Sequence, residues 1–243
     1  MVISTPASTQ LSLQLPSVPA ASPRACMKPP ASVNPDPIPK FRLCRATSKR
    51  NKAYLAIAAV LAVAVVIAGT DPSNGGWVTL LQAKYTRSAD TVARGLGGYN
   101  TSWFVKYAMP VILREIYSHL YTPALVTVWL GANDAALANG SNAERHVPID
   151  LYTANLVQIV KSFSESVPAV IILLVTPPHI DDAVRHKYSN ERSDSKRGQL
   201  DRSNVMAANY ARACVEAANY LGVLVLDLHA YFNEMPASTR NAL

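Results

Sequence analysis

Apolar and polar residues follow two rhythms along positions 75–243. Short runs rich in β-branched residues have the length of buried strands, while the segments between them repeat apolar positions every three or four residues, as amphipathic helices do. The predicted strands are 90–96, 124–130, 169–175 and 223–228. The predicted helices open near Asn74, 103, Pro148 and Ser203. Strands that alternate with helices predict an α/β domain whose parallel sheet is covered on both faces.

The two longest predicted helices carry the clearest end signals. In the helix that opens at Pro148 and Asp150, one apolar face is formed at spacings of three and four residues by Leu156, Ile159, Val160 and Phe163. The last long helix begins near Ser203 and is expected to end at Gly222, because glycine readily takes the left-handed conformation that terminates helices. The charged segment "VRHKYSNERSDSKR" between them is expected to be a solvated loop.

The segment 53–70 is an uncharged apolar run of 18 residues that directly follows the basic cluster "SKRNK". It is just long enough to span a bilayer as a signal anchor, with the basic flank in the cytoplasm. The other interpretation is a first strand, since "VAVVIAG" at 63–69 has the composition of a buried parallel strand. We favour the transmembrane segment because the run is longer than a strand needs, which predicts a single-pass membrane protein. The alternative is a cytoplasmic body, favoured by the glycosylation sequon at Asn100, which lies in a loop expected to border the pocket.

The positive charge is concentrated in the first segment of the chain. Of the 23 basic and 16 acidic residues, residues 1–52 hold eight and one, so 15 of each remain for the rest. Residues 1–52 are also rich in Ser and Pro and have no apolar periodicity, which predicts a disordered tail. The folded domain is expected at 71–243. Because this part is neutral, we expect no nucleic-acid partner.

Cysteine and carboxylate spacing gives no indication of a metal. The three cysteines are far apart and form no C-x-x-C pair, and Cys214 lies among alanines in a helical pattern that suggests core packing. Asp181 and Asp182 are adjacent, but without a third ligand they are more typical of a helix start. We therefore expect no metal site.

Small and polar residues follow the predicted strands, at the edge of a parallel sheet where ligands collect. The loops are "GTDPSNGG", "GLGGYNTS", "GANDAAL" and "TPPHIDD". Gly97 and Gly98 would let a backbone N–H approach a substrate, and Asn133 offers an amide donor, so the two loops together suit a developing oxyanion. Taken singly, the glycines also suit a turn, and Asn133 suits a helix cap. His179, in the last of these loops, is a candidate pocket residue.

Four motifs in order carry a resemblance to a known family. They are "GGWVTLLQAKYTRSADTVARGLGGYNTSW", "WLGANDAAL", "VPIDLYTANL" and "LLVTPPHIDD". Over residues 74–243 the chain resembles the SGNH (GDSL-type) hydrolases, and within them the isoamyl acetate-hydrolysing esterase-like branch. The resemblance implies a flavodoxin-like three-layer α/β/α fold with about five parallel strands. It also implies hydrolysis of small carboxylic esters without metal or cofactor, with Gly98 (backbone) and Asn133 (side chain) as the oxyanion donors.

The chain departs from this family at the two blocks that carry the nucleophile and the base. It contains no G-D-S-[IL] tetrapeptide, and Ser73 stands only two residues before Gly75, too close to replace that serine directly. Where a D-x-x-H pair belongs the chain reads "MPASTRNAL", and Asp227 and His229 are separated by one residue at the end of the last predicted strand. The fold is thus expected to be incomplete at both ends.

Two hypotheses of function remain open. The first is an esterase-family domain for small carboxylic esters that is inactive or truncated as written, because acyl transfer needs a nucleophile and a base besides oxyanion donors. The second is a membrane-anchored pseudoenzyme or binding module, whose pocket takes an ester or carboxylate without turnover. Its membrane association would come from residues 53–70.

Overall fold

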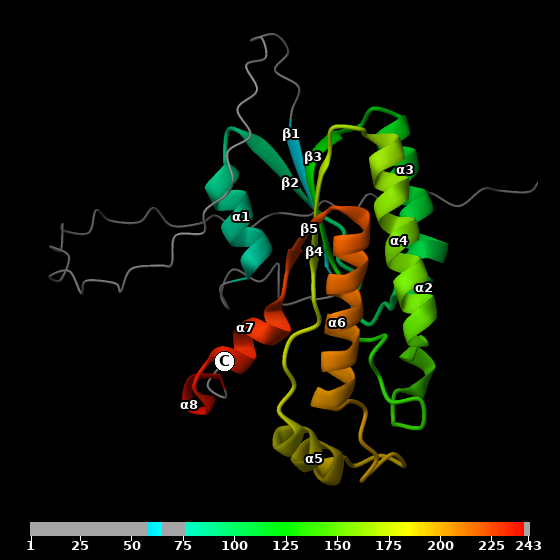
Figure 1. Cartoon of the computed structure of the whole chain (residues 1–243), viewed down its shortest axis with the longest axis vertical. Coiled ribbons are helices and arrows are strands. Elements are labelled where there is room, and N and C mark those ends of the chain that lie inside the picture. Colours follow the sequence, from blue (N-terminus) through cyan, green and yellow to red (C-terminus); the bar gives the residue numbers. More distant parts are fainter. Residues whose placement is uncertain (1–57, 65–75, 241–243) are drawn as a thin grey trace, which may run out of the picture. The chain divides into compact units, whose positions relative to one another are not determined.

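One five-stranded parallel sheet organises the protein (Figure 1). The computed structural model describes residues 58–64 and 76–240. The strand order is β2-β1-β3-β4-β5, and each neighbouring pair is parallel. The strands are β1 (Ala58–Ala64), β2 (Ala89–Ala93), β3 (Thr122–Trp129), β4 (Ile171–Val175) and β5 (Leu224–Leu226). The predicted parallel sheet is confirmed, and its carboxyl ends all face the same edge.

Strand β1 comes from the apolar run 53–70 and corrects our preferred interpretation of it. It lies between β2 and β3, with Ala58 opposite Ala89 and Ala64 opposite Trp129. Runs of alanine and valine suit such a position because inner strands of parallel sheets have continuous apolar sequences. The structure thus supports a strand in this run and not the transmembrane helix, but the strand is Ala58–Ala64 and not the 63–69 expected, of which 65–69 lie outside the described residues. In the described part of the chain no helix has the length and apolar character to cross a bilayer.

Several predicted features lie outside the described residues. These are the tail 1–52, both ends of the apolar run at 53–57 and 65–70, and the loop that contains Ser73.

Helices lie on both sides of the sheet, which confirms the three-layer α/β/α fold (Figure 1). One side carries α3, α4 and α6, and the other carries α1 and α7. The helices are α1 (Trp77–Tyr85), α2 (Thr101–Trp103), η3 (Phe104–Ala108), α3 (Met109–Tyr117), η4 (Ala143–Arg145), α4 (Ile149–Ser166), α5 (Asp182–Glu191), α6 (Asn204–Leu221), α7 (Leu228–Glu234) and α8 (Ala237–Arg240). The apolar face predicted for α4 is buried against the sheet, and Cys214 is buried as predicted.

Helices α5 and α7 and the short elements η4 and α8 were not among the predicted helices. The first part of the charged segment expected to be a loop, residues 184–191, belongs to α5, whereas 192–197 form a loop as expected. The start of α5 is capped by Asp181, which accepts the Ala183 and Val184 amides at 2.9 and 3.1 Å. The sequence did predict a helix start at Asp181 and Asp182, which is confirmed, but not the helix that follows it. Strand β5 ends at Leu226, earlier than predicted, and the Asp227 carboxylate accepts the Ala230 N–H at 3.0 Å. Asp227 therefore begins α7 and does not belong to the strand.

The two faces of the sheet are covered to different extents. In β4 the side chains of Ile172 and Leu174 are buried beneath α4 and α6, whereas Ile171, on the opposite face, is 54% exposed. An apolar groove of about 550 Å³ lies on that opposite face, bordered by Trp77, Trp129, Leu173 and Phe232 among others. The sequence led us to expect cover on both faces, because the predicted strands alternate with helices, and on this second face the cover is incomplete.

Helix α6 offers a test of its predicted start. The Ser203 hydroxyl accepts the Met206 N–H at 3.3 Å, and Gly222 ends the helix at φ 66°, as predicted. Replacing Ser203 with alanine leaves that amide without its acceptor, so we expect the free energy of unfolding to fall by about 1 kcal/mol. Urea unfolding followed by circular dichroism measures the loss. The control is Ser195→Ala, at an exposed serine in the preceding loop; an equal loss in both variants would contradict the capping role.

Candidate functional site

The loops that follow β2 and β3 meet at the carboxyl edge of the sheet. The Asn133 amide nitrogen donates to the Tyr99 carbonyl at 2.8 Å, and the Thr101 N–H donates to the Asp134 carboxylate at 2.9 Å. The structure therefore brings the Gly98 loop and the Asn133 loop together, as the sequence predicted. Their role as oxyanion donors stays a prediction.

Gly98 has a backbone conformation that favours glycine. Its φ is +82°, in the left-handed region, and a β-carbon at this position would lie 3.5 Å from the Arg145 guanidinium. The turn continues with the Tyr99 N–H, which donates to the Leu96 carbonyl at 3.2 Å. The turn suggested for these glycines is thus present, and it is followed by Tyr99, whose carbonyl accepts the Asn133 amide.

The Asn133 side chain is buried and oriented by partners on both of its polar atoms. Its amide oxygen accepts from Arg202 Nη2 at 2.5 Å and from Arg145 Nη1 at 3.5 Å, while its nitrogen faces Tyr99. The helix-cap alternative is not supported, because residues 132–136 form turns. The Asn133 amide nitrogen carries two hydrogens, and one of them is donated to the Tyr99 carbonyl. The predicted oxyanion role therefore rests on the second hydrogen.

Asp134, the second half of the Asn-Asp pair, points into the protein. Its Oδ1 accepts from both the amide and the hydroxyl of Thr101, at 2.9 and 2.5 Å, and Asn155 donates to that hydroxyl at 3.0 Å. Its Oδ2 is buried and has no hydrogen-bond partner among the described residues. Burial raises the pKa of Asp134 to about 6. Asp134 thus ties the two loops together.

The predicted sequon at Asn100 lies in the same network. The Asn100 side chain is buried; its nitrogen donates to the Arg145 carbonyl at 2.9 Å and its oxygen accepts the Trp103 N–H at 2.8 Å. A glycan on this nitrogen is incompatible with the folded loop.

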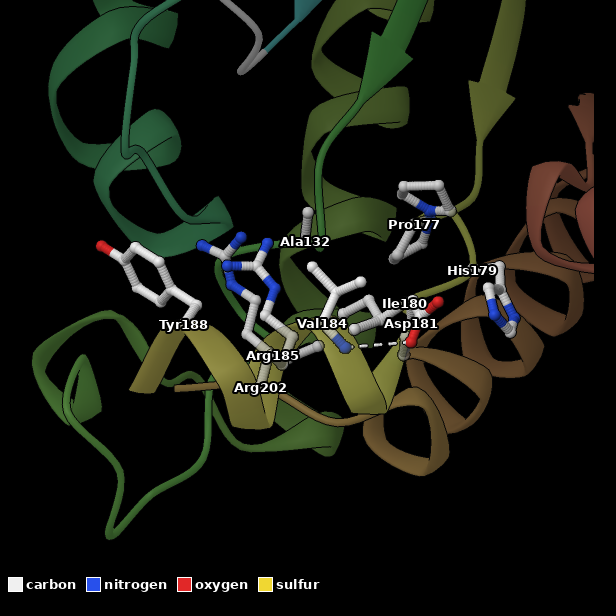
Figure 2. A pocket seen from close by; sticks show the side chains of 12 residues that line it. Ala132, Pro177, His179, Ile180, Asp181, Val184, Arg185, Tyr188 and Arg202 are labelled. Atoms are coloured by element: carbon white, nitrogen blue, oxygen red, sulfur yellow. Dashed lines mark hydrogen bonds between the residues drawn. The ribbon is translucent and has the colours of Figure 1, made fainter. Parts of the chain in front are cut away.

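A cavity of about 530 Å³ opens beside this network (Figure 2). Its walls come from the loops after β3 and β4, from α5 and from the start of α6. The lining residues are Ala132, Ala135, Pro177, Pro178, His179, Ile180, Asp181, Val184, Arg185, Tyr188, Arg202 and Ala207. His179 lines the cavity as predicted. Figure 2 shows two arginines and Tyr188 toward one end, and Asp181 and His179 toward the other.

His229 lies close to His179 in a chain of polar contacts. The two rings are 6.1 Å apart, and Asn233 contacts Nδ1 of both, at 2.7 Å for His179 and 3.0 Å for His229. The second ring nitrogen of His229 contacts Asn204 Oδ1 at 3.0 Å. Burial and the neighbouring His179 lower the pKa of His229. The described residues hold no group of three or more His, Cys, Asp and Glu side chains suited to a metal ion.

Comparisons with known proteins agree with this fold and these loops. The chain is 36% identical over 164 residues to a GDSL esterase/lipase of Arabidopsis thaliana, covering 66% of each chain. It is 39% identical over 156 residues to the isoamyl acetate-hydrolyzing esterase 1 homolog of Rattus norvegicus, covering 64% of this chain and 60% of that protein. The aligned region therefore spans about two thirds or less of these relatives' lengths.

Solved structures support the fold alone, because their sequence identities are low. An acetyl xylan esterase, AlAXEase, superposes with a TM-score of 0.55 at 16% identity, covering 76% of this chain and 84% of that one. A lipase/acylhydrolase from Enterococcus faecalis gives 0.53 at 18% identity, covering 74% and 81%. Residues 57–243 match the sequence family described as GDSL-like Lipase/Acylhydrolase. Since that match covers most of the chain, the protein belongs to the GDSL-like lipase/acylhydrolase family.

Proposed function

We propose that this domain binds small carboxylic esters in the cavity at the carboxyl ends of β3 and β4, and that the chain as written turns them over slowly or not at all. The observation that carries the proposal is the junction of the Gly98 and Asn133 loops, the second of which lines the cavity through Ala132 and Ala135. A backbone N–H from the first loop and an amide N–H from the second would together suit the carbonyl oxygen of an ester. The relatives' names, esterase and lipase, agree with this substrate class.

The slow turnover follows from the groups that acyl transfer requires. An ester is cleaved when an activated nucleophile attacks its carbonyl carbon, a base takes the nucleophile's proton and donors hold the oxyanion. The sequence has neither the G-D-S-[IL] serine nor the D-x-x-H pair that its family resemblance calls for. His179 and His229 contact asparagines and each other, and Ser73 lies outside the described residues. Oxyanion donors without their partners retain binding more readily than catalysis.

The test combines binding with turnover in the full chain. Ethyl butyrate is titrated into the protein while amide chemical shifts are followed, and p-nitrophenyl butyrate reports hydrolysis. We expect shifts in the loops after β3 and β4, and hydrolysis little above the buffer rate. Asn133→Ala removes an amide donor, so it should weaken ester binding by about 3- to 10-fold.

The matched control is Asn219→Ala, at an exposed asparagine near the end of α6. It should bind the ester as the unchanged chain does, and circular dichroism should show that both variants are folded. The absence of ester binding, or equal binding by the two variants, would contradict the proposed site. Fast hydrolysis would contradict the second half of the proposal.

A further inference from the structure

Three arginines gather where the cavity meets the loop after β3. Arg145 lies in η4, Arg185 in α5, and Arg202 just before α6. Arg202 Nη2 and Arg145 Nη1 both donate to the amide oxygen of Asn133, at 2.5 and 3.5 Å. Arg185 and Arg202 line the cavity, and Figure 2 shows their guanidinium groups near Ala132. Two of the three arginines thus share one neutral acceptor, and the third, Arg185, lines the cavity beside Arg202.

Nearby carboxylates neutralise these charges only in part. Asp201 Oδ2 lies 3.6 Å from Arg185 Nη1 and 3.9 Å from Arg202 Nε, longer than the usual hydrogen bond to a carboxylate. Glu144, which is largely exposed, is 3.9 Å from Arg145 Nε. Arg202 Nε is buried and has no hydrogen-bond partner in the described part of the chain. This cluster therefore has unused donors.

The close approach of the arginines has an electrostatic cost. Burial lowers the pKa of Arg202, the Asp201 carboxylate opposes this shift, and the positive charges of Arg185 and Arg145 add to the lowering. A bound anion would reduce the repulsion among the three groups.

The remainder of the cavity is mostly apolar. Ala132, Pro177, Ile180 and Val184 supply aliphatic surface next to the arginines. Asp181 also lines the cavity, but its Oδ1 is occupied by the Ala183 and Val184 amides, and Figure 2 shows it across Val184 from the arginines. The two ends of the cavity thus differ in charge. A ligand that fits has an anionic head and a short aliphatic body.

We propose that this cavity is a carboxylate site, in which Arg185 and Arg202 hold the carboxylate of a short-chain acid and the apolar wall holds its alkyl chain. A guanidinium offers two parallel N–H donors that match the two oxygens of a carboxylate. The proposal rests on the proposed function, since it concerns the same cavity. It adds that the free acid, or an ester with a carboxylate at its tail, is bound more tightly than a neutral ester.

The test is calorimetric titration of the full chain with sodium butyrate, butanamide and inorganic phosphate. Butanamide has nearly the shape of butyrate without its charge, and phosphate has charge without an alkyl chain. We expect butyrate to bind at least about 10-fold more tightly than either, as for a charged hydrogen-bonded pair. Arg185→Gln should weaken butyrate binding by about 10-fold, whereas Arg185→Lys, which keeps the charge, should lose less.

The matched control is Arg212→Gln, which removes the same charge from an exposed position on α6. It should bind butyrate normally, and circular dichroism should show native folding in every variant. The carboxylate site would be overturned if butanamide or phosphate bound as tightly as butyrate. It would also be overturned if Arg185→Gln left the dissociation constant of butyrate unchanged. Binding of ethyl butyrate without binding of butyrate would overturn this inference alone and leave the ester proposal standing.

Discussion

Replacing Gly131 with alanine is expected to lower the free energy of unfolding by about 3 to 5 kcal/mol, from backbone strain and overpacking together. Gly131 has φ +114°, which side-chain-bearing residues rarely adopt. An alanine β-carbon would lie 2.7 Å from the Tyr152 hydroxyl and 2.8 Å from Pro177 Cγ. Tyr152 is fully buried, so its ring has little freedom to move away.

A second glycine separates the two causes of this loss. Gly198 has φ +80°, but nothing lies within 4 Å of the position of its β-carbon. Gly198→Ala should therefore cost only the left-handed strain, about 1 to 2 kcal/mol. Urea unfolding of both variants, followed by circular dichroism, gives the difference that belongs to the collision. Equal losses of free energy in the two variants would show that the contacts with Tyr152 and Pro177 add nothing to the cost of Gly131→Ala.

Gly131 also lets the two loops that line the cavity pack closely together. Because it has no side chain, the turn after β3 packs directly against Pro177 of the next loop, and the Ala135 N–H closes it through the Gly131 carbonyl at 2.9 Å. The cavity residues Ala132 and Pro177 are thereby neighbours, although they lie far apart in the sequence. The sequence showed a glycine at the end of a strand, but the reason for it lies in a contact between two loops.

The strands were predictable from sequence because inner parallel strands are short, branched and apolar. The run 53–70 was misjudged for a related reason: its alanines and valines satisfy a bilayer and a sheet equally well, and its pairing with β2 and β3 is not visible in composition. Helix α5 was missed because it is largely polar and exposed, so it has no apolar period to detect.

The candidate site was predictable only where it follows from sheet topology. Gly98 and Asn133 were expected to meet because parallel strands end at the same edge, and their loops do meet. The arginines were not identified, since Arg145, Arg185 and Arg202 come from three separate segments with no common spacing. The acceptor that Arg145 and Arg202 share, the Asn133 amide oxygen, is formed only when the chain folds.

Asp134 is expected to make the protein less stable as the pH rises from about 4 to 7. Its pKa in the folded protein is raised to about 6 from 3.8, so in this interval the folded state keeps a proton that the unfolded state releases. The protonated carboxyl is favoured because Oδ2 is buried without a partner among the described residues. At 1.36 kcal/mol per pKa unit, the loss by pH 7 is about 3 kcal/mol.

The Asp134→Asn variant isolates this effect, because asparagine is neutral throughout the interval. Measured relative to the unchanged chain at each pH, its free energy of unfolding should rise by about 2 kcal/mol between pH 4 and 7, the rest of the change falling below pH 4, while contributions from other titrating groups cancel. The control is Asp194→Asn, since Arg192 holds the pKa of the exposed Asp194 at about 2, below this interval. Its relative stability should stay level across the same range. A level line for Asp134→Asn as well would mean that Asp134 stays charged in the folded protein, and that its bonds to Thr101 outweigh the cost of burial.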